Sequence, residues 1–147
     1  MTASPHPAPL SPTGLKRLHR WWRRPTELRL SLILDGVQNP YLVGSLLRSA
    51  AAYHAATVWL VPPTPGPNHA GVAKPALGTN RLVECREAAS GPEAVSAAQA
   101  DGFQTVAVEL TDAAVPLFTL DLGAAVCLVL GHEDRGVHRT TLTAVDD

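Results

Sequence analysis

Charged and aromatic residues are scarce in this sequence, and long hydrophobic runs are absent. Of the 147 residues, 17% are charged and 5% are aromatic, whereas 46% are hydrophobic, a composition not expected of a wholly disordered chain. No apolar run approaches the ~20 residues that a membrane-spanning helix needs. The sequence therefore predicts one globular domain with one hydrophobic core and no membrane segment.

Cysteine is also scarce, and no metal-binding pattern is present. Cys85 and Cys127 lie in apolar or strand-like segments and form no CxxC pair, so the sequence indicates neither a disulfide framework nor a zinc site. His132 and His138 lack a third ligand at a suitable spacing, and we expect no metal ion. The N-terminus has no apolar core like that of a signal peptide, which predicts a cytoplasmic protein with reduced thiols.

Three widespread motifs are missing. There is no GxGxxG after the first predicted strand, no GxxxxGK[ST] phosphate loop and no GxSxG nucleophile elbow. The sequence therefore lacks the usual fingerprints of dinucleotide-binding proteins, phosphate-loop enzymes and α/β-hydrolases.

Apolar strands alternate with helices from residue 29 onward. Because the strands are continuously apolar, the pattern predicts an α/β fold with a parallel sheet flanked by helices on both faces. Asn39 and Pro40 are typical of a helix N-cap and first helical residue. The predicted strands are 29–34, 56–61, 81–86, 103–110 and 123–131, and the predicted helices are 41–55, 72–78 (interrupted by Pro75), 91–102 and one that begins at residue 138.

Positive charge is concentrated in the first third of the chain. Residues 1–50 carry a net charge of +5 and residues 51–147 a net charge of −6. After a Pro-rich tail (1–12), a short helix is predicted to run to Arg24, with Leu15, Leu18 and Trp22 on one face. The other positions hold five cations: Lys16, Arg17, Arg20, Arg23 and Arg24. Tryptophan stacks on bases and arginine pairs with phosphates, so this basic arm predicts an RNA contact; the alternative is a solvated helix docked on its own domain.

Residues that follow the strands are candidate ligand contacts, because parallel sheets bind ligands beyond the carboxyl ends of their strands. Gly44 and Arg48 lie four residues apart on a predicted helix and share one face. We expect another backbone to approach Gly44 closely, and we expect Arg48, placed near the N-terminus of the helix, to need an anionic partner. That partner is either a bound phosphate or a structural carboxylate such as Asp35 or Glu133.

Two segments, in this order, carry a resemblance to a known family. LDGVQNPYLVGSLLRSA (34–50) follows the first predicted strand, and LVLGHEDRGV (128–137) follows from the last one. AKPALG (73–78) and VAVELT (106–111) lie between them. Together they resemble the SpoU/TrmH family of RNA 2′-O-methyltransferases in the SPOUT superfamily, over about residues 29–147.

The resemblance implies a SPOUT-like fold with a C-terminal trefoil knot, a homodimer, and methyl transfer from S-adenosylmethionine to a ribose 2′-hydroxyl of tRNA or rRNA. It implies that Arg48 is catalytic and faces the target ribose. A guanidinium loses its proton only above pH ~12, so phosphate contact and support of a developing alkoxide are the expected roles. The resemblance places the cofactor against Leu110, Gly131, Glu133 and Gly136. Gly131 would let adenine approach main-chain amides, and Glu133 would fix its loop or contact the partner's Arg48.

The sequence departs from the family pattern in three places. Leu42 stands where the family usually has Asn, and Asn39 stands where it usually has Asp. The third family motif, an SLN-type segment, does not occur before the chain ends at Asp147. We therefore expect a methyltransferase domain at 26–147 that is truncated at its C-terminus, an incomplete knot, and weak binding of S-adenosylmethionine by these 147 residues. Residues 1–25 are expected to form a basic tail and short helix.

Three functional readings follow. The first is an S-adenosylmethionine-dependent RNA 2′-O-methyltransferase that binds RNA through Arg20, Arg23, Arg24 and Arg48. The second is a catalytically inactive, RNA-binding relic of the same family. The third is an unrelated α/β nucleotide-binding domain in which the motifs are accidental.

Overall fold

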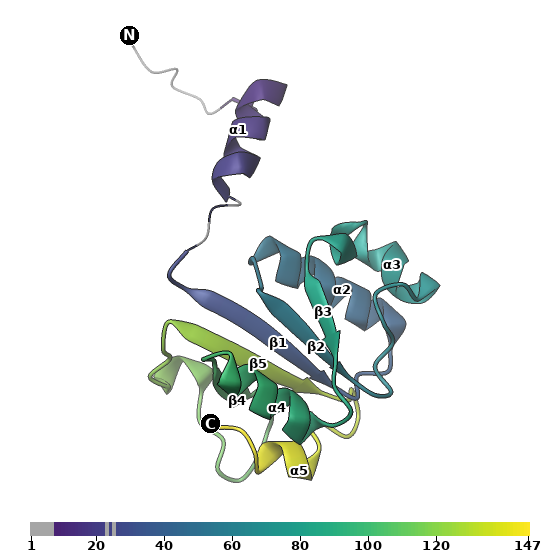
Figure 1. The fold of residues 1–147 in the computed structure, drawn as a ribbon, viewed down its shortest axis with the longest axis vertical. Helices are drawn as coiled ribbons and strands as arrows, with labels where there is room; N and C mark the ends of the chain where they lie inside the picture. Colours follow the sequence, from purple (N-terminus) through teal and green to yellow (C-terminus); the bar gives the residue numbers. More distant parts are fainter. Residues whose placement is uncertain (1–7, 23, 25) are drawn as a thin grey trace.

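A five-stranded parallel sheet forms the centre of the molecule, in a computed structural model that describes residues 8–22, 24 and 26–147. The strand order is β3-β2-β1-β5-β4, and helices cover both faces (Figure 1). The strands are β1 (Arg29–Asp35), β2 (Thr57–Val61), β3 (Glu84–Glu87), β4 (Gln104–Ala107) and β5 (Ala125–Gly131). The helices are α1 (Pro12–Trp22), α2 (Pro40–Ala52), α3 (Ala70–Ala76), η1 (Thr79–Arg81), α4 (Gly91–Ala100), η2 (Leu117–Thr119) and α5 (Arg139–Leu142). The predicted parallel α/β fold is confirmed, whereas the knot stays a prediction.

The core consists of two apolar layers, one on each face of the sheet. Leu32 and Leu34 of β1 pack with Val43 and Leu47 of α2, whereas Ile33, between them, packs with the layer under α4. Successive side chains of a strand point to opposite faces, so a strand covered on both sides must be apolar throughout. This explains why the strands could be predicted from the sequence.

Close packing of α2 against α3 depends on Gly44, as predicted. A Cβ atom at this position would collide with the carbonyl oxygen of Val72 and the ring of Pro75. Asn39 caps α2, because its side-chain oxygen accepts hydrogen bonds from the backbone N–H groups of Tyr41 (3.0 Å) and Leu42 (3.4 Å). Pro40 follows as the first residue of the helix, where a missing N–H costs nothing.

The helix predicted to begin at residue 138 is present as α5, with His138 as its N-cap, but it is short. α5 ends at Leu142, and the chain then returns to β4, the edge strand. The backbone N–H of Asp147 donates to Thr105 (3.1 Å), and the carbonyl of Asp147 accepts from the N–H of Ala107 (2.9 Å). This pair of bonds has the pattern found between parallel strands.

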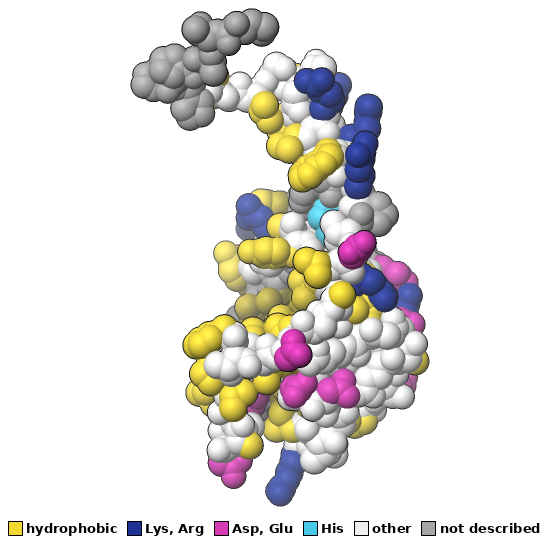
Figure 2. Space-filling view, turned by 90° about the vertical axis from the view of Figure 1, so that its left-hand side faces the viewer, with side chains coloured by type: hydrophobic (Ala, Val, Ile, Leu, Met, Phe, Trp, Pro, Cys, Tyr) yellow, Lys and Arg dark blue, Asp and Glu magenta, His cyan; other side chains and the backbone are white. Residues whose placement is uncertain are grey.

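The basic helix α1 stands apart from the sheet and its covering helices (Figure 1). Leu15 and Leu18 remain 44% and 45% exposed, so the described residues give no support to a helix docked on its own domain. Hydrophobic side chains lie along one side of this helix and Lys and Arg along another (Figure 2). Within the described part of the chain, no helix is long and apolar enough to cross a membrane.

Candidate functional site at the carboxyl edge of the sheet

The two segments that carried the family resemblance meet at the carboxyl edge of the sheet. Glu133, in the loop after β5, accepts hydrogen bonds from the backbone N–H groups of Asn39 (2.8 Å) and Gln38 (3.3 Å), which lead into α2. Burial opposes the charged form of Glu133, but bonds from its own backbone and from these two amides outweigh it and lower the pKa of the carboxyl group. Glu133 therefore joins the two loops as an anion.

The loop at residues 131–136 is a tight turn closed on itself. His132 and Gly136 exchange two backbone hydrogen bonds of 2.9 and 2.8 Å, and Gly136 has a φ of 70°. Gly131 is needed because a Cβ there would collide with the backbone of Gly136 and Val137. The protein's own backbone fills the space that a side chain at Gly131 would take, so the glycine lets the turn close, and its contact with adenine stays a prediction.

A carboxylate beyond the end of β4, in a stretch that follows a strand and was therefore a candidate for ligand contact, connects this loop to β4. Glu109 accepts hydrogen bonds from the backbone N–H groups of Val137 and Leu110, both at 2.8 Å. Its carboxylate also lies where any side chain at Gly136 would have to sit. Nothing local in the sequence predicts this contact, because Glu109 and Val137 meet only when β4 and β5 are side by side.

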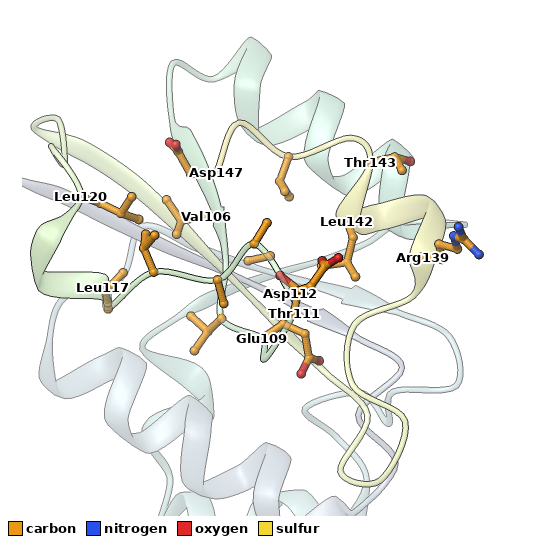
Figure 3. Close-up of a pocket in the computed structure, with 16 residues that line it drawn as sticks. Val106, Glu109, Thr111, Asp112, Leu117, Leu120, Arg139, Leu142, Thr143 and Asp147 are labelled. Atoms are coloured by element: carbon orange, nitrogen blue, oxygen red, sulfur yellow. The ribbon is translucent and has the colours of Figure 1, made fainter.

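Two cavities flank the segment that follows β4, and both are lined by Val108 and Glu109. The larger, of about 570 Å³, lies between the end of β4, residues 111–120 and the C-terminal segment with α5. In Figure 3, Leu117 and Leu120 lie on one side of it and Leu142 on the other, while Arg139 points away. The smaller, of about 480 Å³, is lined by the loop at 131–136 and by Leu42 and Leu46 of α2.

Three of the four predicted cofactor residues lie together in the structure, and the fourth, Leu110, lies apart from them. Gly131, Glu133 and Gly136 all line the smaller cavity. Leu110 does not belong to β4, which ends at Ala107, and its side chain is 94% exposed outside both cavities. The larger cavity could not be predicted from the sequence, because its apolar lining comes from loop residues without a periodic pattern.

Arg48 is exposed on α2 and forms no ion pair with any described residue, so neither Asp35 nor Glu133 holds it. It is the ninth of the 13 residues of the helix, so the expected position near the N-terminus is wrong. The helix dipole therefore does not disfavour its charge there. Its guanidinium remains available to an anion from outside the domain.

The described arginines of the basic arm that are predicted to contact RNA lie away from the carboxyl edge of the sheet. Arg20 lies on α1 and Arg24 just after it, both exposed and outside the two cavities. Arg23 lies outside the described residues. The structure thus places this arm and the carboxyl edge of the sheet in separate regions (Figure 1).

Asp35 has a partner that the sequence analysis did not identify. Its carboxylate is fully buried at the end of β1, accepts a hydrogen bond from the backbone N–H of His138 (3.0 Å) and lies 2.9 Å from the Nδ1 atom of that residue. A buried carboxylate requires such hydrogen-bond partners. The charged residue at the end of an apolar strand was therefore the feature of the sequence that could have indicated this contact. Among the described residues, no group of three or more His, Cys, Asp or Glu is placed to hold a metal ion.

Comparison with known proteins gives the family. The model of the SpoU rRNA Methylase family matches residues 29–147, which include β1, α2 and the whole carboxyl edge. The chain belongs to this family. The reading as an unrelated nucleotide-binding domain is therefore wrong.

Curated relatives in this SpoU family are longer than the chain. It is 27% identical over 140 residues to the tRNA (guanosine(18)-2′-O)-methyltransferase of Escherichia coli, a match that covers 93% of the chain and 58% of the relative. It is 32% identical over 118 residues to a 23S rRNA (guanosine-2′-O-)-methyltransferase of a Burkholderia species, covering 80% and 47%. The chain thus spans about half the length of the curated relatives it matches.

Solved structures of the SpoU family share the fold. An S-adenosylmethionine-bound rRNA methyltransferase from Sinorhizobium meliloti aligns with a TM-score of 0.74 and 25% identity, covering 82% of this chain and 46% of that one. A TrmH/SpoU tRNA-modifying enzyme from A. aeolicus aligns with a TM-score of 0.71 at 18% identity, covering 90% and 66%. At 18% identity, the second comparison shows a shared fold and carries no statement about function.

Proposed function

We propose that this SpoU-family chain transfers the methyl group of S-adenosylmethionine to a ribose 2′-hydroxyl of tRNA or rRNA. Relatives named for this reaction on tRNA and on 23S rRNA support the proposal. The observation that carries it is the pair of hydrogen bonds that the carboxylate of Glu133 accepts from the backbone N–H groups of Asn39 and Gln38. They hold the loop after β5 against the start of α2, the helix on which Arg48 is exposed.

The larger cavity suits the cofactor. Its volume of about 570 Å³ lies within the range of about 300–1,000 Å³ usual for small-molecule sites. Val106, Leu117 and Leu142 offer apolar surface for an adenine ring, and Glu109 and Asp112 offer negative charge to a ligand with a sulfonium and an ammonium group. When bound, S-adenosylmethionine supplies an electrophilic methyl group on sulfur.

Gly131, Glu133 and Gly136, which line the neighbouring smaller cavity, remain proposed contacts of the cofactor and also shape the tight turn. Gly131 and Gly136 let the turn close, and Glu133 fixes it to the segment before α2. The backbone of Leu110, next to Glu109, is the remaining predicted contact with the cofactor, since its side chain points into solvent.

Arg48 is proposed to act on the acceptor. Its charge stabilises the 2′ oxygen as the bond from oxygen to the methyl carbon forms, the S–CH3 bond breaks to leave S-adenosylhomocysteine, and the hydroxyl proton passes to solvent water. The guanidinium can also contact the adjacent phosphate. Arg20, Arg23 and Arg24 of the basic arm are proposed to contact the RNA backbone at a distance from the reaction. We further propose a homodimer acting in the cytoplasm.

A methyl-transfer assay tests the proposed function. Bulk tRNA and rRNA are incubated with the protein and S-adenosylmethionine labelled in its methyl group, and the product is digested with alkali. A 2′-O-methyl group protects the neighbouring phosphodiester, so we expect label in alkali-resistant dinucleotides. Arg48→Ala should abolish most of the transfer, and Arg81→Ala, which removes an exposed arginine on η1, should not.

The relic reading has one observation in its favour. Leu42 lines the smaller cavity, where the family usually offers the amide of Asn, so a polar contact is lost. Binding of RNA without any transfer to tRNA or rRNA would favour this reading. Transfer that persists unchanged in Arg48→Ala would contradict the catalytic role of Arg48.

A further inference from the structure

An aromatic side chain lies exposed at the start of α2 without a partner in the fold. Tyr41 is 70% exposed, and its hydroxyl forms no hydrogen bond with any described residue. Its backbone is fixed at both sides, because its N–H donates to Asn39 (3.0 Å) and its carbonyl accepts from the hydroxyl of Ser45 (2.9 Å). A large apolar ring is thus held in solvent on a rigid backbone.

Tyr41 and Arg48 lie on the same face of α2. They are seven residues apart, which is two helical turns, so their side chains point in nearly the same direction about 10 Å apart along the axis. Leu42 and Leu46, which line the smaller cavity, occupy the adjacent strip of the helix. Gly44 lies on the other side of the strip formed by Tyr41 and Arg48 and faces α3.

The charge on this helix favours an anionic partner. α2 has no acidic residue, and Arg48 is its only charged side chain. An exposed tyrosine beside an unpaired arginine is the combination that binds single-stranded nucleic acid, since the ring stacks on a base and the guanidinium pairs with a phosphate.

We propose that Tyr41 is a base-stacking platform that positions the RNA acceptor next to Arg48. One base of a single-stranded segment lies on the ring of Tyr41, and the phosphate backbone runs along the same face toward Arg48. This inference rests on the proposed RNA substrate and adds to it a positioning residue and a preference for unpaired RNA.

The test compares Tyr41 with a matched tyrosine on the same helix. Tyr53, the C-cap of α2, is 76% exposed but lies at the opposite end of the helix and outside the strip of Tyr41 and Arg48. The probe is a short single-stranded oligoribonucleotide that contains 2-aminopurine, whose fluorescence is quenched when it stacks on an aromatic ring. We expect Tyr41→Ala to weaken binding about tenfold and to abolish quenching, while Tyr41→Phe retains both. Tyr53→Ala should behave like the unaltered protein.

The outcomes separate this inference from the proposed function. If Tyr41→Ala binds the probe and quenches it as the unaltered protein does, the platform is refuted, even where Arg48→Ala still loses methyl transfer. If Tyr41→Ala instead changes the molecular mass in light scattering, the ring belongs to an interface between copies of the chain, and the inference is equally refuted. Failure of the unaltered protein to bind any RNA would count against the proposed function itself.

Discussion

The carboxylate of Glu133 lies 2.8 Å from the backbone nitrogen of Asn39, the residue that caps α2. The same Asn39 accepts hydrogen bonds from the first amides of the helix, so the turn after β5 and the start of α2 share one chain of hydrogen bonds. β1 and β5 are adjacent in the sheet, with Asp35 opposite Gly131, and this pairing brings the two loops together. The position of Arg48 relative to the turn is thus set by the sheet and fixed by one carboxylate.

Replacing Glu133 should loosen this connection. Glu133→Ala leaves two backbone amides without their acceptor, and we expect a loss of about 1 kcal/mol in the free energy of unfolding and a larger proportional loss of methyl transfer. Glu133→Gln keeps one acceptor oxygen and should lose less of both. Urea denaturation and the transfer assay measure the two effects. Equal transfer by all three proteins would contradict the role of Glu133 in joining the loops.

Much of the fold could be predicted from the sequence, because its signals are local. Continuous apolar runs marked β1, β2 and β5, and Asn39 followed by Pro40 marked the start of α2. The need for Gly44 could also be predicted, since a glycine within a helix usually accommodates a close neighbour.

The shape of the site could not be predicted in the same way. The hydrogen bond from the backbone N–H of Val137 to Glu109 joins residues 28 positions apart, and the pair formed by Asp35 and His138 joins residues 103 positions apart. No local pattern in the sequence indicates either contact. The packing around Gly131 could not be predicted for the same reason, because its neighbour is the returning backbone at Gly136. The contacts that close the site depend on the tertiary structure.

Gly44→Ala tests the close packing of α2 and α3. The added Cβ meets the backbone of Val72 and the ring of Pro75, which cannot rotate away, so we expect a loss of about 1–3 kcal/mol in the free energy of unfolding. Without this collision the substitution should stabilise the protein, because alanine favours a helix over glycine by about 1 kcal/mol. A loss of stability therefore reports the close contact between the two helices. Gly66→Ala is the control, since nothing lies within 4 Å of a Cβ at that position. A more stable Gly44→Ala protein would show that the helices are not in contact there.

The basic arm gives a prediction that is independent of the cofactor. Replacing Arg20, Arg23 and Arg24 together by Ala removes three cations and should lower RNA affinity while leaving the affinity for S-adenosylmethionine unchanged. If each arginine neutralises one phosphate of single-stranded RNA, the slope of log affinity against log salt should fall by about 2. Fluorescence anisotropy over a range of salt concentrations measures this slope. An unchanged slope would show that the arm does not contact the RNA backbone.

The attachment of the C-terminal segment to β4 should depend on pH through Asp146. Its carboxylate accepts hydrogen bonds from the backbone N–H (2.9 Å) and the hydroxyl (2.8 Å) of Thr105, and these bonds lower the pKa of Asp146 below its ordinary value of 3.8. A lowered pKa in the folded state means that the stabilisation is complete above the ordinary pKa and is lost as the pH falls through the lower, folded value.

Asp146→Asn removes the charged acceptor at every pH. The difference in stability between the two proteins should therefore be greatest near neutral pH and should shrink as the solution is acidified below about pH 4. Thermal denaturation at a series of pH values measures it, and a difference that grows on acidification would contradict the assignment of this carboxylate as the charged anchor of the segment.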